Sequence, residues 1–116
     1  MESQKVYNLE ERTYLFAKDC RLLIQKLSKT ISNIEDCKQL VKSSGSIAAN
    51  YIEANEKLTD KDFKFRLKIA RKEAKESVLW LKLLRDLNNK FKIELSELMQ
   101  EAEELRKILS AIINKS

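Results

Sequence analysis

Seven basic side chains recur along one stretch of the sequence with the type and spacing that phosphate binding requires. They are Lys61, Lys64, Lys68, Arg71, Lys72, Lys75 and Lys82. On a helix, which advances about 100° per residue, all seven fall within roughly one third of the circumference. A row of cations binds a polyanion because each neutralised phosphate releases condensed counterions, a gain that does not depend on base sequence. We call these seven residues the basic stripe, and they favour a nucleic-acid interface of low sequence specificity.

The stripe also has a plainer interpretation as a solvated helix face, and the sequence leaves both open. Lysine-rich faces are common on surface helices, and the carboxylates of Glu73 and Glu76 could partly neutralise the positive charge. Neither glutamate shares the arc of the stripe, however. Residues 57–92 hold twelve of the 23 Lys and Arg residues but only five of the 18 Asp and Glu residues, so this segment is the source of the net charge of +5.

The composition argues against catalysis and against a bound metal or cofactor. The chain has no histidine, which is the commonest general base and metal ligand, and its single glycine excludes a glycine-rich phosphate loop. A metal site built from Glu53, Glu73 and Glu76 is disfavoured because metal-binding bundles usually supply Glu-x-x-His pairs. We expect a non-catalytic protein that holds no cofactor and no metal.

The two cysteines and the absence of long apolar runs bear on location. Cys20 and Cys37 are too far apart for a C-x-x-C motif, and each is expected to be a small, reduced core residue. Neither a signal peptide nor an apolar run of membrane length is evident. We therefore expect a cytoplasmic protein that does not enter a membrane.

An all-α fold must position these groups, because the sequence has no proline, one glycine and helical periodicity almost throughout. The periodicity predicts four helices, at about residues 9–31, 33–56, 60–87 and 94–114. Ser32 or Asn33 is the expected N-cap of the second helix, and Thr59 followed by Asp62 resembles a capping box before the third. Short connections predict an antiparallel, up-down-up-down four-helix bundle in a single domain spanning residues 1–116.

The second predicted helix contains a run of small residues from Ser43 to Ala49 that only Ile47 interrupts. Small side chains let a neighbouring helix approach closely, which explains Gly45 despite its cost of about 1 kcal/mol relative to alanine. The alternative is a polar pocket, because three polar side chains spaced four and three residues apart share one side of this helix. These are Ser46, Asn50 and Glu53.

The third predicted helix has two apolar faces rather than one. Its core stripe consists of Phe63, Leu67, Ala70, Ala74, Val78 and Leu81. A second apolar group, on the far side of the basic stripe, consists of Phe65, Ile69, Trp80 and Leu83. A helix in a small monomer has no use for a second face that contains Trp and Phe. Leu15 and Leu22, opposite the core stripe of the first helix, indicate the same, so we expect the chain to associate with copies of itself.

The segment "SIAANYIEANEKLTDKDFKFRLKIARKEAKESVLWL", Ser46 to Leu81, resembles the signature of a small four-helix-bundle family. That family includes proteins encoded in intervening sequences of bacterial 23S ribosomal RNA genes, and the accessory variability determinant (Avd-like) proteins of diversity-generating retroelements are similar. The family pattern is a "SIAANIAEG" helix, a short polar turn and "F-x-x-F-L-x-I-A-x-G-S-x-x-E". The matching residues are Ser46, Ile47, Ala48, Ala49, Asn50, Glu53, Phe63, Leu67, Ile69, Ala70 and Glu76.

Three departures from the pattern accompany these matches. Asn55 and its neighbours stand where the family has a helix-ending glycine, and Lys72-Glu73 replaces its G-S pair. Arg66 stands where a second aromatic is usual.

The resemblance implies a four-helix bundle without enzymatic activity that assembles into a homopentameric ring. It also implies nucleic-acid binding on a basic outer surface and, for the retroelement members, association with a reverse transcriptase. RNA binding is the usual proposal for the ribosomal members. The polar residues that match the pattern are expected to be structural rather than chemical. They are Ser46, Asn50, Glu53 and Glu76.

Two hypotheses of different classes follow from the sequence. The first is a homo-oligomeric, non-catalytic protein that binds RNA or DNA phosphates through the basic stripe. The second is a helical scaffold that binds a protein partner, with the lysines serving solubility alone. Added nucleic acid at moderate salt distinguishes them, because only the first would bind it.

Overall fold

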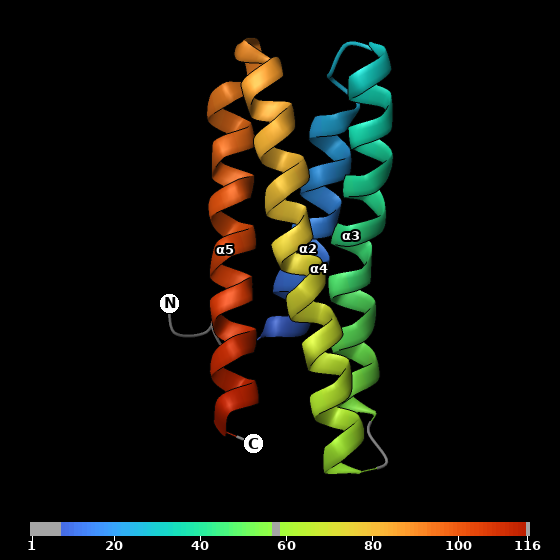
Figure 1. The fold of residues 1–116 in the computed structure, drawn as a ribbon, viewed down its shortest axis with the longest axis vertical. Helices are drawn as coiled ribbons and strands as arrows, with labels where there is room; N and C mark the ends of the chain where they lie inside the picture. The colour runs from blue at the N-terminus through green and yellow to red at the C-terminus, as the bar shows by residue number, and fades with distance from the viewer. Residues whose placement is uncertain (1–7, 57–58, 116) are drawn as a thin grey trace.

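Four long α-helices form the computed structural model, which describes residues 8–56 and 59–115 (Figure 1). They are α2 (Leu9–Ile24), α3 (Ile31–Asn55), α4 (Asp60–Leu87) and α5 (Lys92–Lys115), with a 3₁₀ turn, η1 (Asn89–Phe91), before the last. The chain reverses direction at each connection, so that α2 and α4 run upward in Figure 1 while α3 and α5 run downward. The described residues therefore confirm the all-α prediction, and none of their helices is long and apolar enough to span a membrane.

The helices surround one apolar core, and their order around it determines which faces point outward. α4 packs against α3 and α5, while α2 packs against the same two helices from the opposite side of the bundle (Figure 1). Leu67, Leu81 and Leu105 are fully buried between them. Burial of each such leucine contributes about 1.5–3 kcal/mol to stability. The outer side of α4 therefore faces away from the rest of the bundle.

The first helix ends earlier than the sequence pattern predicts. We expected it to reach residue 31, but α2 stops at Ile24, and tight hydrogen bonds from Lys26 N to Leu23 O and from Leu27 N to Ile24 O close its last turn. Thr30, and not Ser32 or Asn33, is the N-cap of α3, because its side chain accepts a hydrogen bond from Asn33 N at 3.1 Å. The apolar spacing misled the prediction because it continues through the turn.

The other predicted boundaries lie closer to those observed. Thr59 caps α4, with its Oγ1 accepting a hydrogen bond from Asp62 N at 3.0 Å. α4 spans the predicted residues, and α5 begins two residues before the predicted start. The short polar turn expected between the second and third helices includes residues 57–58, which lie outside the described residues.

The small residues of α3 admit side chains from two neighbouring helices. A Cβ on Gly45 would lie 3.1 Å from Nη2 of Arg21, so the glycine makes room for an arginine of α2 rather than for a helix backbone. That arginine donates hydrogen bonds to Ser44 Oγ at 3.3 Å and Val41 O at 3.2 Å. On the α4 side, Ser43 Oγ and Ser77 Oγ are 2.8 Å apart and both side chains are buried.

Both cysteines are buried free thiols, and burial makes Cys20 the less reactive of the two. Burial raises the pKa of Cys20 to about 12, with a smaller contribution from Asp19, and it also raises the pKa of Cys37. Because the thiolate is the reactive form, we expect a maleimide at pH 8 to label Cys37 first and Cys20 only when the protein unfolds. Mass spectrometry of timed samples checks this, and native Cys20 labelling at the rate of a free thiol would contradict it.

Candidate nucleic-acid interface

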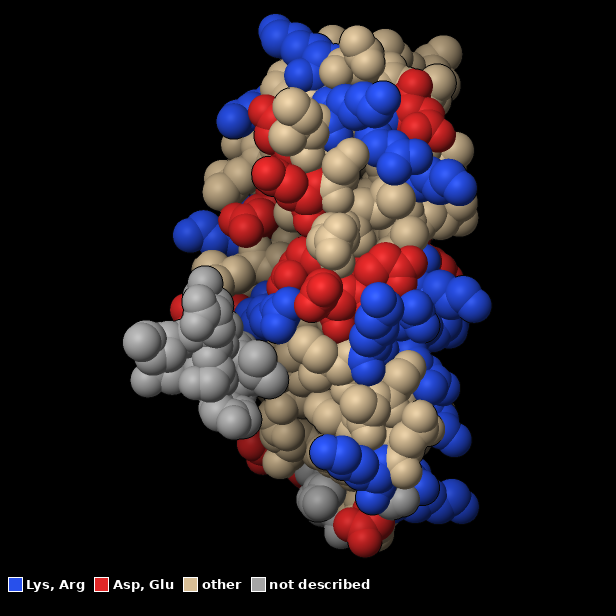
Figure 2. Space-filling view, turned by 90° about the vertical axis from the view of Figure 1, so that its left-hand side faces the viewer, with Lys and Arg blue, Asp and Glu red and all other residues tan. Residues whose placement is uncertain are grey.

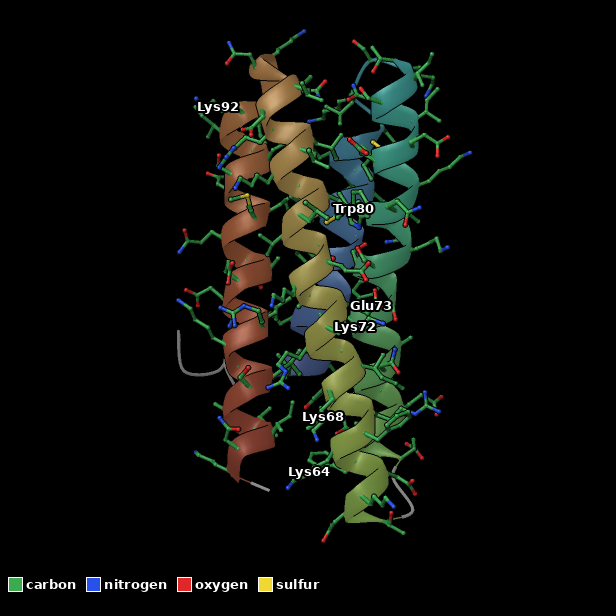
Figure 3. The ribbon with its side chains drawn as sticks, viewed as in Figure 1. Lys64, Lys68, Lys72, Glu73, Trp80 and Lys92 are labelled. Carbon is green, nitrogen blue, oxygen red and sulfur yellow. The ribbon has the colours of Figure 1, made fainter. Side chains whose placement is uncertain are left out.

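The basic stripe lies on the outward side of α4. Lys64, Lys68 and Lys72 extend away from the core along the front of the bundle in Figure 3. Figure 2 shows Lys and Arg atoms gathered along its right-hand edge, the side on which α4 lies, whereas Asp and Glu atoms lie toward the middle of the view. Five members are exposed, namely Lys61, Lys68, Lys72, Lys75 and Lys82.

Two members of the stripe lie at its edge and are half-buried. Arg71 Nη1 donates a hydrogen bond to Ser110 Oγ of α5 at 3.4 Å, so this guanidinium lies at the seam between α4 and α5. Lys64 is the other half-buried member. The most accessible cations are therefore the five exposed lysines.

None of the seven cations forms an ion pair with a carboxylate of residues 8–56 and 59–115. The ion pairs of this part of the chain lie elsewhere: Arg12 with Glu101 and Glu104, Lys38 with Glu35, Arg85 with Asp86, and Arg106 with Glu103. A cation that is already paired must give up its carboxylate to bind a phosphate. The stripe has no such partner to lose, which makes it suited to an external anion.

Acidic side chains bound the stripe on its α3 side. Glu73 lies between α4 and α3 in Figure 3, and both it and Glu76 are half-buried. Burial and the nearby Glu76 raise the pKa of Glu73, while Lys72 and Lys42 lower it in part. On the α5 side the neighbouring helix covers the seam. The longest row of exposed cations therefore runs along α4, with Lys42 of α3 near Glu73.

The predicted polar pocket forms only in part. Asn50 Nδ2 donates hydrogen bonds to Ser46 O and Ser46 Oγ, each at 2.9 Å. Asn50 Oδ1 accepts one from Arg66 Nη1 at 3.2 Å. Glu53, however, is exposed, and no hydrogen bond or ion pair joins its side chain to Ser46 or Asn50. Arg66, at the position where the family pattern has an aromatic, takes its place.

The second apolar face of α4 is narrower than predicted. Trp80 and Ile69 are half-buried, and Trp80 packs against the core with its Nε1 buried and lacking a hydrogen-bond partner. α3 approaches α4 closely at Ser77, one turn before Trp80. Phe65 is 57% exposed and Leu83 37% exposed. The sequence reasoning missed Leu79, which lies among the lysines and is 48% exposed.

The fold and the site define a small all-α bundle in which the cations of the basic stripe form no ion pairs with the described residues. Known proteins resemble this chain both in sequence and in structure. The sequence profile described as "23S rRNA-intervening sequence protein" matches residues 5–111. The chain therefore belongs to that family. A similar crystal structure from Bacteroides thetaiotaomicron VPI-5482, of a protein of unknown function from the S23 ribosomal protein family, is 28% identical. The two structures align over 95% of this chain and 98% of the Bacteroides protein, with a TM-score of 0.81. No curated protein matches the chain.

Proposed function

We propose that this protein is a non-catalytic nucleic-acid-binding protein whose basic stripe contacts phosphates without reading base sequence. The observation that carries the proposal is the row of exposed lysines on α4, none of which has a carboxylate partner in the described chain. Membership of a family tied to 23S ribosomal RNA genes supports it. Among the described residues, no group of three or more side chains suits a metal ion, so phosphate binding would rest on the lysines themselves.

Self-assembly is part of the same proposal, in the form of a homopentameric ring. Leu15 and Leu22 are exposed on α2, and Leu83 and Leu87 are exposed at the carboxyl end of α4. Because α2 and α4 lie on opposite sides of the bundle, each chain presents two different apolar faces that point away from each other (Figure 1). Head-to-tail contacts between unlike faces produce a ring when the rotation closes.

Two wider elements of the proposal come from the resemblance rather than from the contacts. A reverse transcriptase is a candidate protein partner, because retroelement proteins of similar pattern associate with one. The cytoplasm is the proposed compartment, since ribosomal RNA and retroelement transcripts are found there. Neither element is needed for phosphate binding by the stripe.

The test replaces three neighbouring stripe residues in the variant Lys64→Ala, Lys68→Ala, Lys72→Ala. We expect affinity for a labelled 12-nucleotide RNA to fall at least about tenfold, and the slope of log K against log salt to decrease by about 2, because three phosphate contacts are lost. Fluorescence anisotropy between about 50 and 200 mM salt gives both quantities. Binding should weaken alike for different sequences.

A matched control removes the same charge from the other side of the bundle. Lys18→Ala, Lys26→Ala, Lys29→Ala alters three exposed lysines on α2 and the turn that follows it. This variant should bind nearly as the unmodified protein does. Equal losses from the two variants would show that net charge alone attracts the RNA. No loss from either would show that the stripe is a solvated face and would favour the protein-binding scaffold.

A further inference from the structure

An exposed aromatic ring lies at the edge of the basic stripe. Phe65 is 57% exposed. On the helix surface it lies one turn after Lys61 and one turn before Lys68, so cations flank it on both sides along α4. The guanidinium carbon of Arg66 lies 5.9 Å from the centroid of its ring. The sequence alone had placed Phe65 in an apolar interface with Trp80, whereas the structure shows Phe65 exposed and Trp80 half-buried.

We propose that the stripe binds a single-stranded nucleic acid and that Phe65 is the surface on which one unpaired base stacks. This inference rests on the proposed function and adds the class of nucleic acid to it. Single-strand sites combine a cationic track for the backbone with aromatic rings for the bases, because every base has a π face. Lys61, Lys68 and Lys72 supply the track around Phe65.

The shape of the charged surface favours one strand over a duplex. The cations of α4 form one row, with Glu73 on the α3 side and α5 along the other. On the α3 side the carboxylates of Glu73 and Glu76 accompany Lys42, so a second phosphate strand would meet fewer unopposed cations there than along α4. In a duplex, moreover, the base faces are stacked on one another, and an exposed phenyl ring has no base to contact.

The position of Phe65 also separates it from the proposed contacts between copies. Leu83 lies 18 residues further along α4, which corresponds to about 27 Å. Four exposed lysines lie between the two residues, at positions 68, 72, 75 and 82. A contact that buries Leu83 and Leu87 would thus leave Phe65 free. A second copy of the chain could also cover Phe65, because its residues 93–116 are net acidic and would be attracted to the lysines beside the ring.

The experiment compares Phe65→Leu with Phe65→Tyr in the full-length chain. Leucine keeps an apolar side chain but removes the π face, whereas tyrosine keeps the ring. The probes are a labelled uridine 12-mer, the matching thymidine 12-mer and a 12-base-pair RNA duplex, measured by anisotropy. Leu79→Ala is the matched control, because Leu79 is an exposed apolar residue of the same outward face, 48% exposed. Light scattering on each variant reports the assembly state.

We expect Phe65→Leu to bind both single strands about tenfold more weakly, because one stacking contact is lost. Its affinity for the duplex should not change, and Phe65→Tyr and Leu79→Ala should bind all three probes as the unmodified protein does. Equal losses for the RNA and DNA strands are expected, since stacking does not involve the 2′-hydroxyl.

Three results would overturn the inference. If Phe65→Leu binds the single strands normally while the triple lysine variant is weakened, the stripe contacts phosphates only and the proposed function survives. If both variants bind normally, the proposed function fails as well. If Phe65→Leu instead lowers the mass measured by light scattering, a second copy of the chain covers this ring.

Discussion

Replacement of Asn33 by leucine is expected to lower the free energy of unfolding by about 2 kcal/mol. The Asn33 side chain is 3% exposed and forms a reciprocal amide pair with Asn88, in which the two N···O distances are 2.8 and 2.9 Å. Asn33 Nδ2 also donates to Ser28 O at 2.9 Å. Leucine fills similar space but leaves the amide of Asn88 and the carbonyl of Ser28 without these partners. Ser28 is exposed, and half-buried Asn88 still donates from Nδ2 to Leu84 O at 2.8 Å, so the cost falls mainly on the unpaired Asn88 Oδ1 and the lost hydrogen bonds. A polar group left without its partner costs about 1–3 kcal/mol.

Urea unfolding followed by circular dichroism measures this loss, and the melting temperature should drop by about 10 °C. Asn89→Leu is the control, because this neighbouring asparagine is exposed. The double variant Asn33→Leu, Asn88→Leu should be less destabilised than the sum of the single variants, since both amides are then absent. A loss below about 0.5 kcal/mol for Asn33→Leu would show that the amide pair does not hold the start of α3 to the end of α4.

The parts of the fold that the sequence predicted well depend on local signals. Thr59 and Asp62 are three residues apart, and the cap that they form needs no distant partner. The position of the basic stripe is also local, because residues on one helix keep fixed angular relations whatever surrounds them. The assignment of these lysines to one face of α4 therefore followed from spacing alone.

The features that the sequence did not predict depend on residues that are distant in the chain. Asn33 and Asn88 are 55 residues apart, and their pairing fixes the turn that the periodicity had assigned to a helix. The covering of Trp80 likewise depends on how closely α3 approaches α4. Neither the Asn33–Asn88 pairing nor the approach of α3 to α4 can be predicted from one helix, because each depends on how two helices pack.

The candidate site shows the same division between local and non-local information. Spacing placed the cations together, but it could not show that they lack carboxylate partners among the described residues, since ion pairs such as Arg12 with Glu101 join residues 89 positions apart. Exposure of Phe65 was equally inaccessible, because a ring on a helix flank can be covered by either neighbouring helix. The structure thus changes the interpretation of Phe65 while leaving the stripe where the sequence placed it.

Replacement of Ser43 by alanine is expected to cost about 2 kcal/mol, whereas the double variant Ser43→Ala, Ser77→Ala should be within about 1 kcal/mol of the unmodified protein. Ser43 Oγ lies 3.4 Å from Leu40 O as well as 2.8 Å from Ser77 Oγ. Either hydroxyl can donate in the Ser43–Ser77 contact, and when Ser43 donates to Leu40 O its Oγ accepts from Ser77. Loss of Ser43 leaves the fully buried Ser77 hydroxyl without an acceptor, and removal of both hydroxyls eliminates that unsatisfied group.

Urea unfolding of the two single variants and the double variant completes the cycle. Ser77→Ala should cost less than Ser43→Ala, because Ser43 can still donate to Leu40 O. Each Ser→Ala change removes a single oxygen atom, so the order of stabilities reports mainly the hydrogen bonds and much less the change in volume. Additive losses would mean that the small size of serine alone sets the approach of α3 to α4. A double variant that recovers stability would show that the two hydroxyls are coupled, and that each single variant loses stability because it leaves a buried partner unsatisfied.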